Sequence, residues 1–315
     1  MMKDKPQIGV SACLAKQPVR FDGCFIANPF VNNECSEFFD LHTICPEVEM
    51  GLGIPRPVIQ LRDFDGEVRL VFSKNPEKDI TNEMREYSER KLDALPPLDG
   101  YIFKKDSPSC GVFNVAVKND KTGMRKRNGI GIFAQAFKDR FPEVPTEDEG
   151  RLNDKGIREN FLERVYAHYR WRQIDSAQSP MLAFRDFHKN YKLILMAKDN
   201  TAYRQLGRIA ASVNKNNFVQ VRQEYFQLFM QAMAEIPSQG HHVKLMMHIL
   251  GYLKDHLNKK DKVELLEWFE TYRENRVTRI TPLSLLQHHF NRHENEYITK
   301  QYYFSPFPGK LMLPQ

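Results

Sequence analysis

Three cysteines lie in short motifs that could support chemistry, although they are far apart in the sequence. Cys13 ends the stretch Val10-Ser-Ala-Cys13, Cys45 begins Cys45-Pro-Glu47, and Cys110 follows Lys104-Lys-Asp-Ser-Pro-Ser. Three thiolates together suit a soft metal centre. Because the motifs lack CxxC spacing, burial of each cysteine as a small apolar side chain is the more common explanation for such a pattern. Spacing alone therefore leaves metal binding and packing open.

Each motif follows a segment that has the composition of a buried strand. The segments are Gln7 to Ala12, Leu41 to Ile44 and Gly100 to Phe103. A helix is predicted from Asp79 to Leu95, with Pro96 and Pro97 ending it. Alternating strands and helices predict an α/β, Rossmann-like domain with a mostly parallel sheet. Loops at the carboxyl ends of parallel strands meet at one edge, so we expect the three cysteines to converge there.

The second half of the chain is predicted to be all-α. Residues 157–172 are predicted to form an amphipathic helix, and residues 173–180 have the composition of a linker. Further helical periodicity covers residues 218–234, 243–257 and 262–274, with another helix continuing through Phe290. We therefore predict two domains, residues 1–172 and residues 181–315.

Two arginines near the cysteine motifs are candidate anion ligands. Arg20 precedes the Asp22-Gly23 turn, and Arg56 follows a proline in the second motif. Either guanidinium could bind a substrate phosphate or a negatively charged metal group, and either could instead form a structural salt bridge. The sequence does not decide between these interpretations.

Other polar features are weaker candidates. The run Lys121 to Arg127 is predicted to be a solvated loop rather than a nucleic-acid patch. Gly129-Ile-Gly131 lacks the third glycine of a phosphate-binding turn. His241, His242 and His248 have no neighbouring carboxylate or cysteine motif, so we expect surface or core histidines there.

Composition indicates a folded protein outside the membrane. Hydrophobic residues make up 41% of the 315 residues, and the formal net charge of +6 suits an anionic ligand without requiring nucleic acid. The N-terminal residues lack the apolar region of a signal peptide, and no window resembles a membrane span. All five cysteines fall within the first 110 residues. We expect a cytoplasmic protein with reduced thiols and no membrane partner.

The three cysteine motifs together resemble the thiouracil and thiouridine desulfidase family, often called TudS, over residues 6–165. The resemblance implies that Cys13, Cys45 and Cys110 hold a 4Fe-4S cluster, whereas Cys24 and Cys35 lie outside its motifs. It also implies catalytic roles for Glu47 and Ser107, which match the acidic and hydroxyl positions of the family site. In that case Glu47 activates water or moves protons, and Ser107 protonates or orients the leaving sulfur or a ring nitrogen.

Three thiolates leave one iron of such a cluster open to substrate, where it acts as a Lewis acid toward an exocyclic sulfur. The leading hypothesis is therefore an enzyme, an iron-sulfur-dependent C–S hydrolase. It removes sulfur from a thiolated uracil base or nucleotide and releases hydrosulfide without net redox chemistry. A tRNA substrate and a homodimer are further possibilities.

The second half, from about Phe184 to Pro314, resembles the YbgA-type helical domain. The resemblance is carried by His248-Ile-Leu-Gly-Tyr252 and by the ending Gln301-Tyr-Tyr-Phe-Ser-Pro-Phe-Pro308. It implies an accessory domain without an assigned chemistry.

Two alternatives to the desulfidase remain at this stage. One is a non-catalytic nucleotide- or RNA-binding module with a structural metal and a helical partner-binding domain. The other is a thiol redox enzyme that uses Cys110 as its nucleophile, for which no CxxC motif supplies a resolving cysteine.

Overall fold

The structure is a computed structural model that describes residues 5–312 of the chain. Packing separates two units, one up to residue 161 and one from residue 162 onward, so the division falls within helix α5 (Lys155–Arg172). The domain limits expected from the sequence, 1–172 and 181–315, stay a prediction. Each unit is described separately below.

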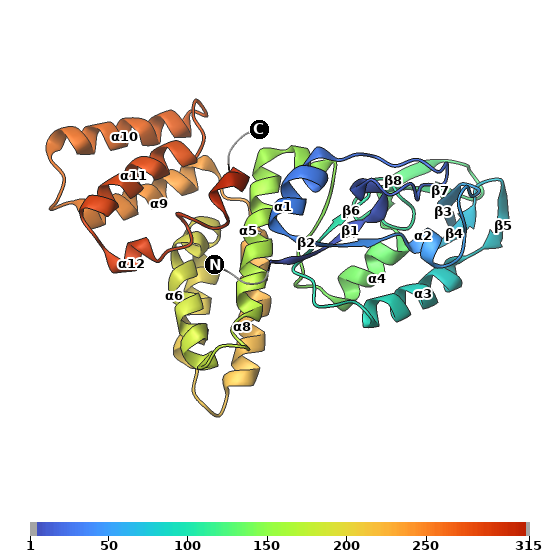
Figure 1. Cartoon of the computed structure of the whole chain (residues 1–315), viewed down its shortest axis with the longest axis horizontal. Coiled ribbons are helices and arrows are strands. Elements are labelled where there is room, and N and C mark those ends of the chain that lie inside the picture. Colours follow the sequence, from blue (N-terminus) through green and yellow to red (C-terminus); the bar gives the residue numbers. More distant parts are fainter. Residues whose placement is uncertain (1–4, 313–315) are drawn as a thin grey trace. The chain divides into compact units, whose positions relative to one another are not determined.

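A four-stranded parallel sheet forms the centre of the first unit (Figure 1). Its spatial order is β2-β1-β6-β9, and the strands are β1 (Gln7–Ser11), β2 (Asp40–Ile44), β6 (Gly100–Phe103) and β9 (Thr146–Asp148). The three strands predicted before the cysteine motifs are present, which confirms the α/β class. The fourth strand was not predicted, because its sequence, Thr-Glu-Asp, is typical of a charged turn.

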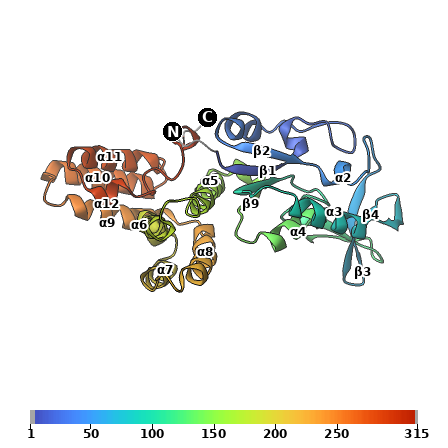
Figure 2. The same ribbon diagram turned by 60° about the horizontal axis from the view of Figure 1, so that its bottom comes forward.

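The sheet is covered on both faces. Helices α3 (Thr81–Asp93) and α4 (Ile132–Arg140) lie on one face, and the segment of η2 (Phe30–Cys35) and α1 (Ser36–Phe38) lies on the other (Figures 1 and 2). Apolar side chains of the central strands are fully buried between these layers, which explains their continuous apolar runs.

A second sheet has five strands, which lie in the sequence between β2 and β6 and between β6 and β9. Most of it was not predicted from the sequence. Its order is β5-β4-β3-β7-β8, and only the β3–β7 pair is parallel. The strands are β3 (Ile59–Phe64), β4 (Glu67–Phe72), β5 (Asn75–Asp79), β7 (Val115–Asn119) and β8 (Arg125–Gly129). Asp65 and Gly66 both have positive φ between β3 and β4. An Asp-Gly pair between alternating apolar residues is a hairpin signal that could have revealed this sheet.

The second unit is all-α, as predicted. Its helices are α6 (Pro180–Lys198), α7 (Asn200–Ala211), α8 (Phe218–Ala234), α9 (Gln239–Leu250), α10 (Lys259–Arg273), α11 (Ile280–Arg292) and α12 (Glu296–Thr299). They enclose an aromatic-rich core in which Trp171 stacks on Tyr225 and Phe226. Between residues 5 and 312, no helix has both the length and the apolar character needed to cross a membrane.

Candidate functional site

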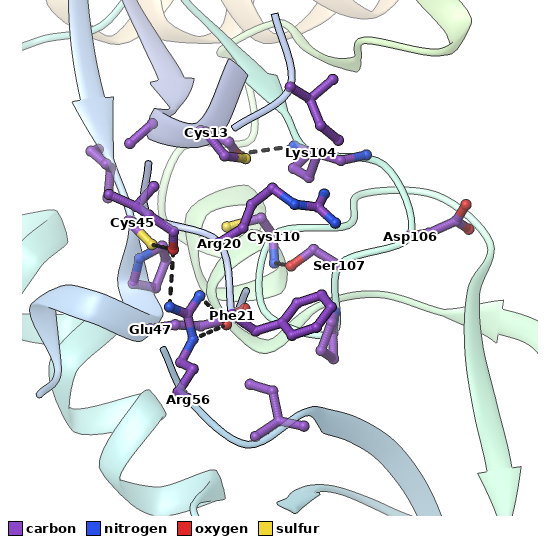
Figure 3. Close-up of a pocket in the computed structure, with 18 of the residues that line it drawn as sticks. Cys13, Arg20, Phe21, Cys45, Glu47, Arg56, Lys104, Asp106, Ser107 and Cys110 are labelled. Atoms are coloured by element: carbon purple, nitrogen blue, oxygen red, sulfur yellow. Dashed lines mark hydrogen bonds and ion pairs between the residues drawn. The ribbon is translucent and has the colours of Figure 1, made fainter. Parts of the chain in front are cut away.

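The three cysteines line a single cavity of about 370 Å³ in the first unit (Figure 3). Cys13 lies in the turn η1 (Ala12–Ala15) after β1, Cys45 precedes the short helix α2 (Pro46–Glu49) after β2, and Cys110 follows β6. Because these strands are parallel, their carboxyl ends deliver all three loops to one edge. The structure thus brings together residues that are up to 97 positions apart in the sequence.

Burial controls the chemistry of these thiols. It raises the pKa of Cys13 to about 11, against the opposing effect of the Lys104 ammonium group. It also raises the pKa of Cys45, and it raises that of Cys110 well above its ordinary value. Neutral thiols are therefore favoured unless a cation compensates for the loss of hydration.

The remaining cysteines lie elsewhere. Cys35 is buried in the η2 segment and Cys24 is exposed, and neither is among the described residues that line the cavity. Over the described part of the chain, no three His, Cys, Asp or Glu side chains are close enough to hold one metal ion.

Glu47 also lines the cavity, and two neighbouring side chains fix its carboxylate. Glu47 Oε2 accepts hydrogen bonds from Arg56, with distances of 2.6 Å to Nη2 and 2.8 Å to Nε. Ser109 Oγ donates to Glu47 Oε1 at 2.9 Å. Ser109 is fully buried and Glu47 is partly open to the cavity. The carboxylate is therefore held in one orientation by groups from two different loops.

Arg56 has its hydrogen-bonding capacity engaged by the protein. Besides Glu47, its Nη1 donates to the carbonyl oxygens of Val19 (2.9 Å) and Gly53 (3.3 Å), and only 3% of its side chain is exposed. Arg56 also lines the cavity, and its role as an anion ligand stays a prediction beside the ion pair that it forms with Glu47.

Ser107 lines the cavity beside Cys110. Its Oγ accepts hydrogen bonds from the backbone N–H groups of Cys110 (3.0 Å) and Ser109 (3.3 Å). These bonds occupy the lone pairs of the hydroxyl, and within residues 5–312 no acceptor for its O–H is found. Ser107 can therefore donate a proton or a hydrogen bond into the cavity.

Glu49 fixes the backbone at Cys45. Its Oε1 accepts from the N–H of Cys45 at 3.0 Å, and its Oε2 accepts from Tyr87 Oη at 2.8 Å and pairs with Lys91 Nζ at 2.7 Å. Burial by itself raises the pKa of Glu49, but these hydrogen bonds outweigh it and lower the pKa. Since Tyr87 and Lys91 belong to α3, this contact ties the Cys45 loop to the helical layer.

Arg20 and Phe21, which we call the lip of the cavity, combine a cation with an aromatic ring. Arg20 is about one-quarter exposed and makes a long ion pair of 3.5 Å with Asp22. Its guanidinium carbon lies 5.6 Å from the centroid of the Phe21 ring. Arg20 therefore remains a candidate anion ligand, and Phe21 adds an apolar surface that the sequence analysis did not single out.

The loop after β6 contributes charged residues for which no role was predicted from the sequence. Lys104, Lys105 and Asp106 line the cavity, and Lys104 Nζ forms an ion pair with Glu149. They begin the third cysteine motif, but their place in the cavity depends on the strand that precedes them.

Several weaker candidates lie outside this site. Gly131 packs against the backbone of Ser109 and Cys110 so closely that a Cβ would lie 2.5 Å from Ser109, which explains a glycine there by packing. The run from Lys121 to Arg127 is exposed, although its last part belongs to β8. His242 is buried against Tyr303 Oη at 2.9 Å, and His241 and His248 are exposed.

Two family models match separate parts of the chain, one before and one after helix α5. Residues 8–149 match a family model described as 2-thiouracil desulfurase, and residues 192–308 match one described as a protein of unknown function, DUF1722. A curated relative, the uncharacterized protein YbgA of Escherichia coli (strain K12), is 22% identical over 163 residues. That match covers 51% of this chain and 96% of the relative.

A solved structure, described as the [4Fe-4S]-dependent thiouracil desulfidase TudS, is similar to part of the chain. It is 28% identical, with a TM-score of 0.37, and the match covers 47% of this chain and 94% of that protein. The family matches agree with the two resemblances seen in the sequence. The chain therefore joins a region that matches the 2-thiouracil desulfurase model to a C-terminal region that matches the DUF1722 model.

Proposed function

We propose that the first unit is a 4Fe-4S cluster-dependent desulfidase that removes sulfur from a thiolated uracil base or nucleotide. One observation carries the proposal. The three motif cysteines, Glu47 and Ser107 line one cavity within the region that matches the 2-thiouracil desulfurase model. Packing alone does not require thiols from three separate loops to face the same cavity.

The donor set fits an iron-sulfur cluster. Cys13, Cys45 and Cys110 supply three soft sulfur ligands, and their high pKa values are those of buried thiols that a bound cation would deprotonate. When bound through three cysteines, such a cluster supplies a Lewis-acidic iron with an open position for the substrate sulfur. Cys24 and Cys35 have no part in this assignment.

Glu47 is suited to accept a proton. Arg56 and Ser109 leave part of its carboxylate facing the cavity in a fixed orientation, where it can orient a water molecule and take its proton. Ser107 is suited to donate to the sulfur or to a ring nitrogen of the substrate. In the overall reaction, oxygen from water replaces the exocyclic sulfur, which leaves as hydrosulfide, so neither an oxidant nor a reductant is required.

Arg20 is the candidate contact for a substrate phosphate, since its guanidinium is partly exposed at the lip and its ion pair with Asp22 is long. A free base lacks this contact. The proposal therefore includes a preference for a nucleotide that depends on Arg20.

The test begins with protein purified without oxygen. About four iron atoms and four acid-labile sulfides per chain are expected for one cluster. Sulfide release is then measured with thiouracil, thiouridine monophosphate and a thiouridine-containing tRNA. Zinc in place of iron would contradict the proposal. Binding of these compounds without sulfide release would favour the non-catalytic binding module instead.

Two variants separate the catalytic groups from the metal ligands. Glu47→Gln and Ser107→Ala are expected to reduce sulfide release by roughly 100-fold or more, the size of effect typical of general acid-base groups, with iron content near that of the wild type. A matching loss of iron in either variant would assign that residue to the support of the metal site instead of to proton transfer.

A further inference from the structure

Phe21 is the one aromatic side chain among the described residues that line the cavity. It is 39% exposed, and it lies beside the apolar side chains of Ile26, Ile44, Val58 and Ile59, which line the same cavity. Figure 3 shows its ring extending from the lip toward the part of the cavity where Ser107 lies. The ring thus faces the space in which the proposed chemistry occurs.

Hydrogen bonds hold the backbone that carries this ring. The carbonyl of Phe21 accepts from the N–H of Arg56 at 2.9 Å, and a tight turn is closed by Gly23 N–H donating to the Arg20 carbonyl at 3.0 Å. Gly23 adopts a φ of +76°, a conformation that other residues rarely accept. The backbone of Phe21 is therefore tied to the same arginine whose side chain orients Glu47.

An exposed ring with a cation beside it is a common surface for binding nucleobases. Every base has a flat π-face, and stacking on an aromatic side chain contributes to affinity with little dependence on base edges. The substrate's exocyclic sulfur must point toward the thiols while the base is held by its face. A lip residue such as Phe21 can hold the base in this way without occupying the space around Cys110.

We propose that Phe21 is the residue that binds the pyrimidine ring, by stacking on its face. The inference rests on the proposed function for the choice of ligand, and it assigns to Phe21 a specificity-determining role that affects binding far more than the chemical step. The proposed catalytic groups, Glu47 and Ser107, stay unchanged in this assignment.

The experiment compares substitutions at Phe21 with a matched control on the same loop. Phe21→Ala removes the ring, Phe21→Leu keeps an apolar side chain, and Phe21→Trp keeps an aromatic one. Phe25→Ala is the control, because Phe25 is also an exposed phenylalanine (48%) but does not line the cavity. Iron content and melting temperature of every variant are measured first, and should equal those of the wild type.

Two readouts are used, so that binding and chemistry can fail separately. Equilibrium binding of thiouridine monophosphate is measured by calorimetry, and KM and kcat for its desulfuration are measured by sulfide release. Phe21→Ala should weaken binding and raise KM on the order of 10- to 100-fold, with kcat nearly unchanged. Phe21→Leu should be impaired almost as much, and Phe21→Trp should restore binding.

The outcomes are distinct. If Phe21→Ala binds like the wild type, or if Phe25→Ala is equally impaired, the stacking assignment is wrong. If Phe21→Leu restores binding fully, the contact is apolar and stacking is excluded. If the wild type binds the nucleotide and Phe21→Ala does not, but no sulfide is released, then the base-binding role stands and the desulfidase function fails.

Discussion

The two units of this chain use polar side chains in opposite ways. In the first unit, loops after parallel strands direct thiols, a carboxylate and hydroxyls into a cavity. In the helical unit, comparable groups are enclosed in the core. Glu163 is buried between Lys198 (3.2 Å) and Arg279 (2.8 Å), and His188 is buried against Tyr225 Oη at 3.0 Å.

This difference separates groups that are available for chemistry from groups that serve packing. A titratable side chain in a helix core has its partners already in place, so its main effect is on stability. A group at a strand end faces whatever enters the cavity. The comparison predicts that substitutions in the first unit change metal content and turnover, whereas those in the second change the free energy of unfolding.

The largest effect is expected from removing a proposed metal ligand. Cys45→Ser should lose most of the iron and nearly all sulfide release. This effect is larger than the roughly 10- to 100-fold loss that is typical when a residue that only hydrogen-bonds to a metal ligand is replaced. Iron analysis and sulfide assay provide the measurement. Cys24→Ser, an exposed cysteine outside the cavity, is the control and should behave as the wild type. Equal iron content in the two variants would show that the cavity thiol of Cys45 does not bind the metal, and would contradict the proposal.

The next effect concerns the buried charges of the helical unit. Burial alone would raise the pKa of Glu163, but Lys198 and Arg279 lower it to about 2. Glu163→Gln leaves two buried cations without their carboxylate and should destabilise the protein by about 3–5 kcal/mol. Urea unfolding followed by helix circular dichroism measures this. Glu296→Gln, which removes an exposed ion pair with Lys300, should have almost no effect.

A smaller effect is expected from pH. Burial lowers the pKa of His188 from 6.5 to about 4, so the unfolded chain binds a proton more readily than the folded chain between these values. Stability should therefore decrease as the pH falls from about 6.5 to about 4, by up to about 3 kcal/mol for this group. Unfolding at pH 7.5 and pH 5 should show a smaller difference in His188→Gln than in the wild type. An unchanged difference would show that His188 is not kept neutral by the fold.

The smallest effect is expected from Ser109, which orients Glu47 without lining the cavity. Ser109→Ala removes the hydrogen bond to Glu47 Oε1 and should lower kcat roughly 10-fold, with KM and iron content unchanged. Steady-state kinetics distinguish this from a structural defect, which would lower the melting temperature as well. A fall in iron content would instead show that the loop of Cys110 has lost its conformation.

Local patterns in the sequence are enough to predict many of the elements and the candidate ligands. Strong apolar runs predict β1, β2 and β6, and helical periodicity predicts α8 with its observed limits, Phe218–Ala234. These features are local, since a strand or an amphipathic helix is encoded by neighbouring residues. The three cysteine motifs are likewise evident from the sequence alone, because each consists of adjacent residues.

The contacts of the polar residues depend instead on the tertiary structure. The sequence left Arg56 open between a phosphate ligand and a salt bridge, and its pairing with Glu47 depends on how the loop after β2 folds back. Ser109 and Phe21 could not be distinguished from other serines and phenylalanines, because their roles arise from contacts between loops distant in the sequence. Spacing along the chain specifies a motif, but the distances between side chains that permit chemistry are set by how the strands pack.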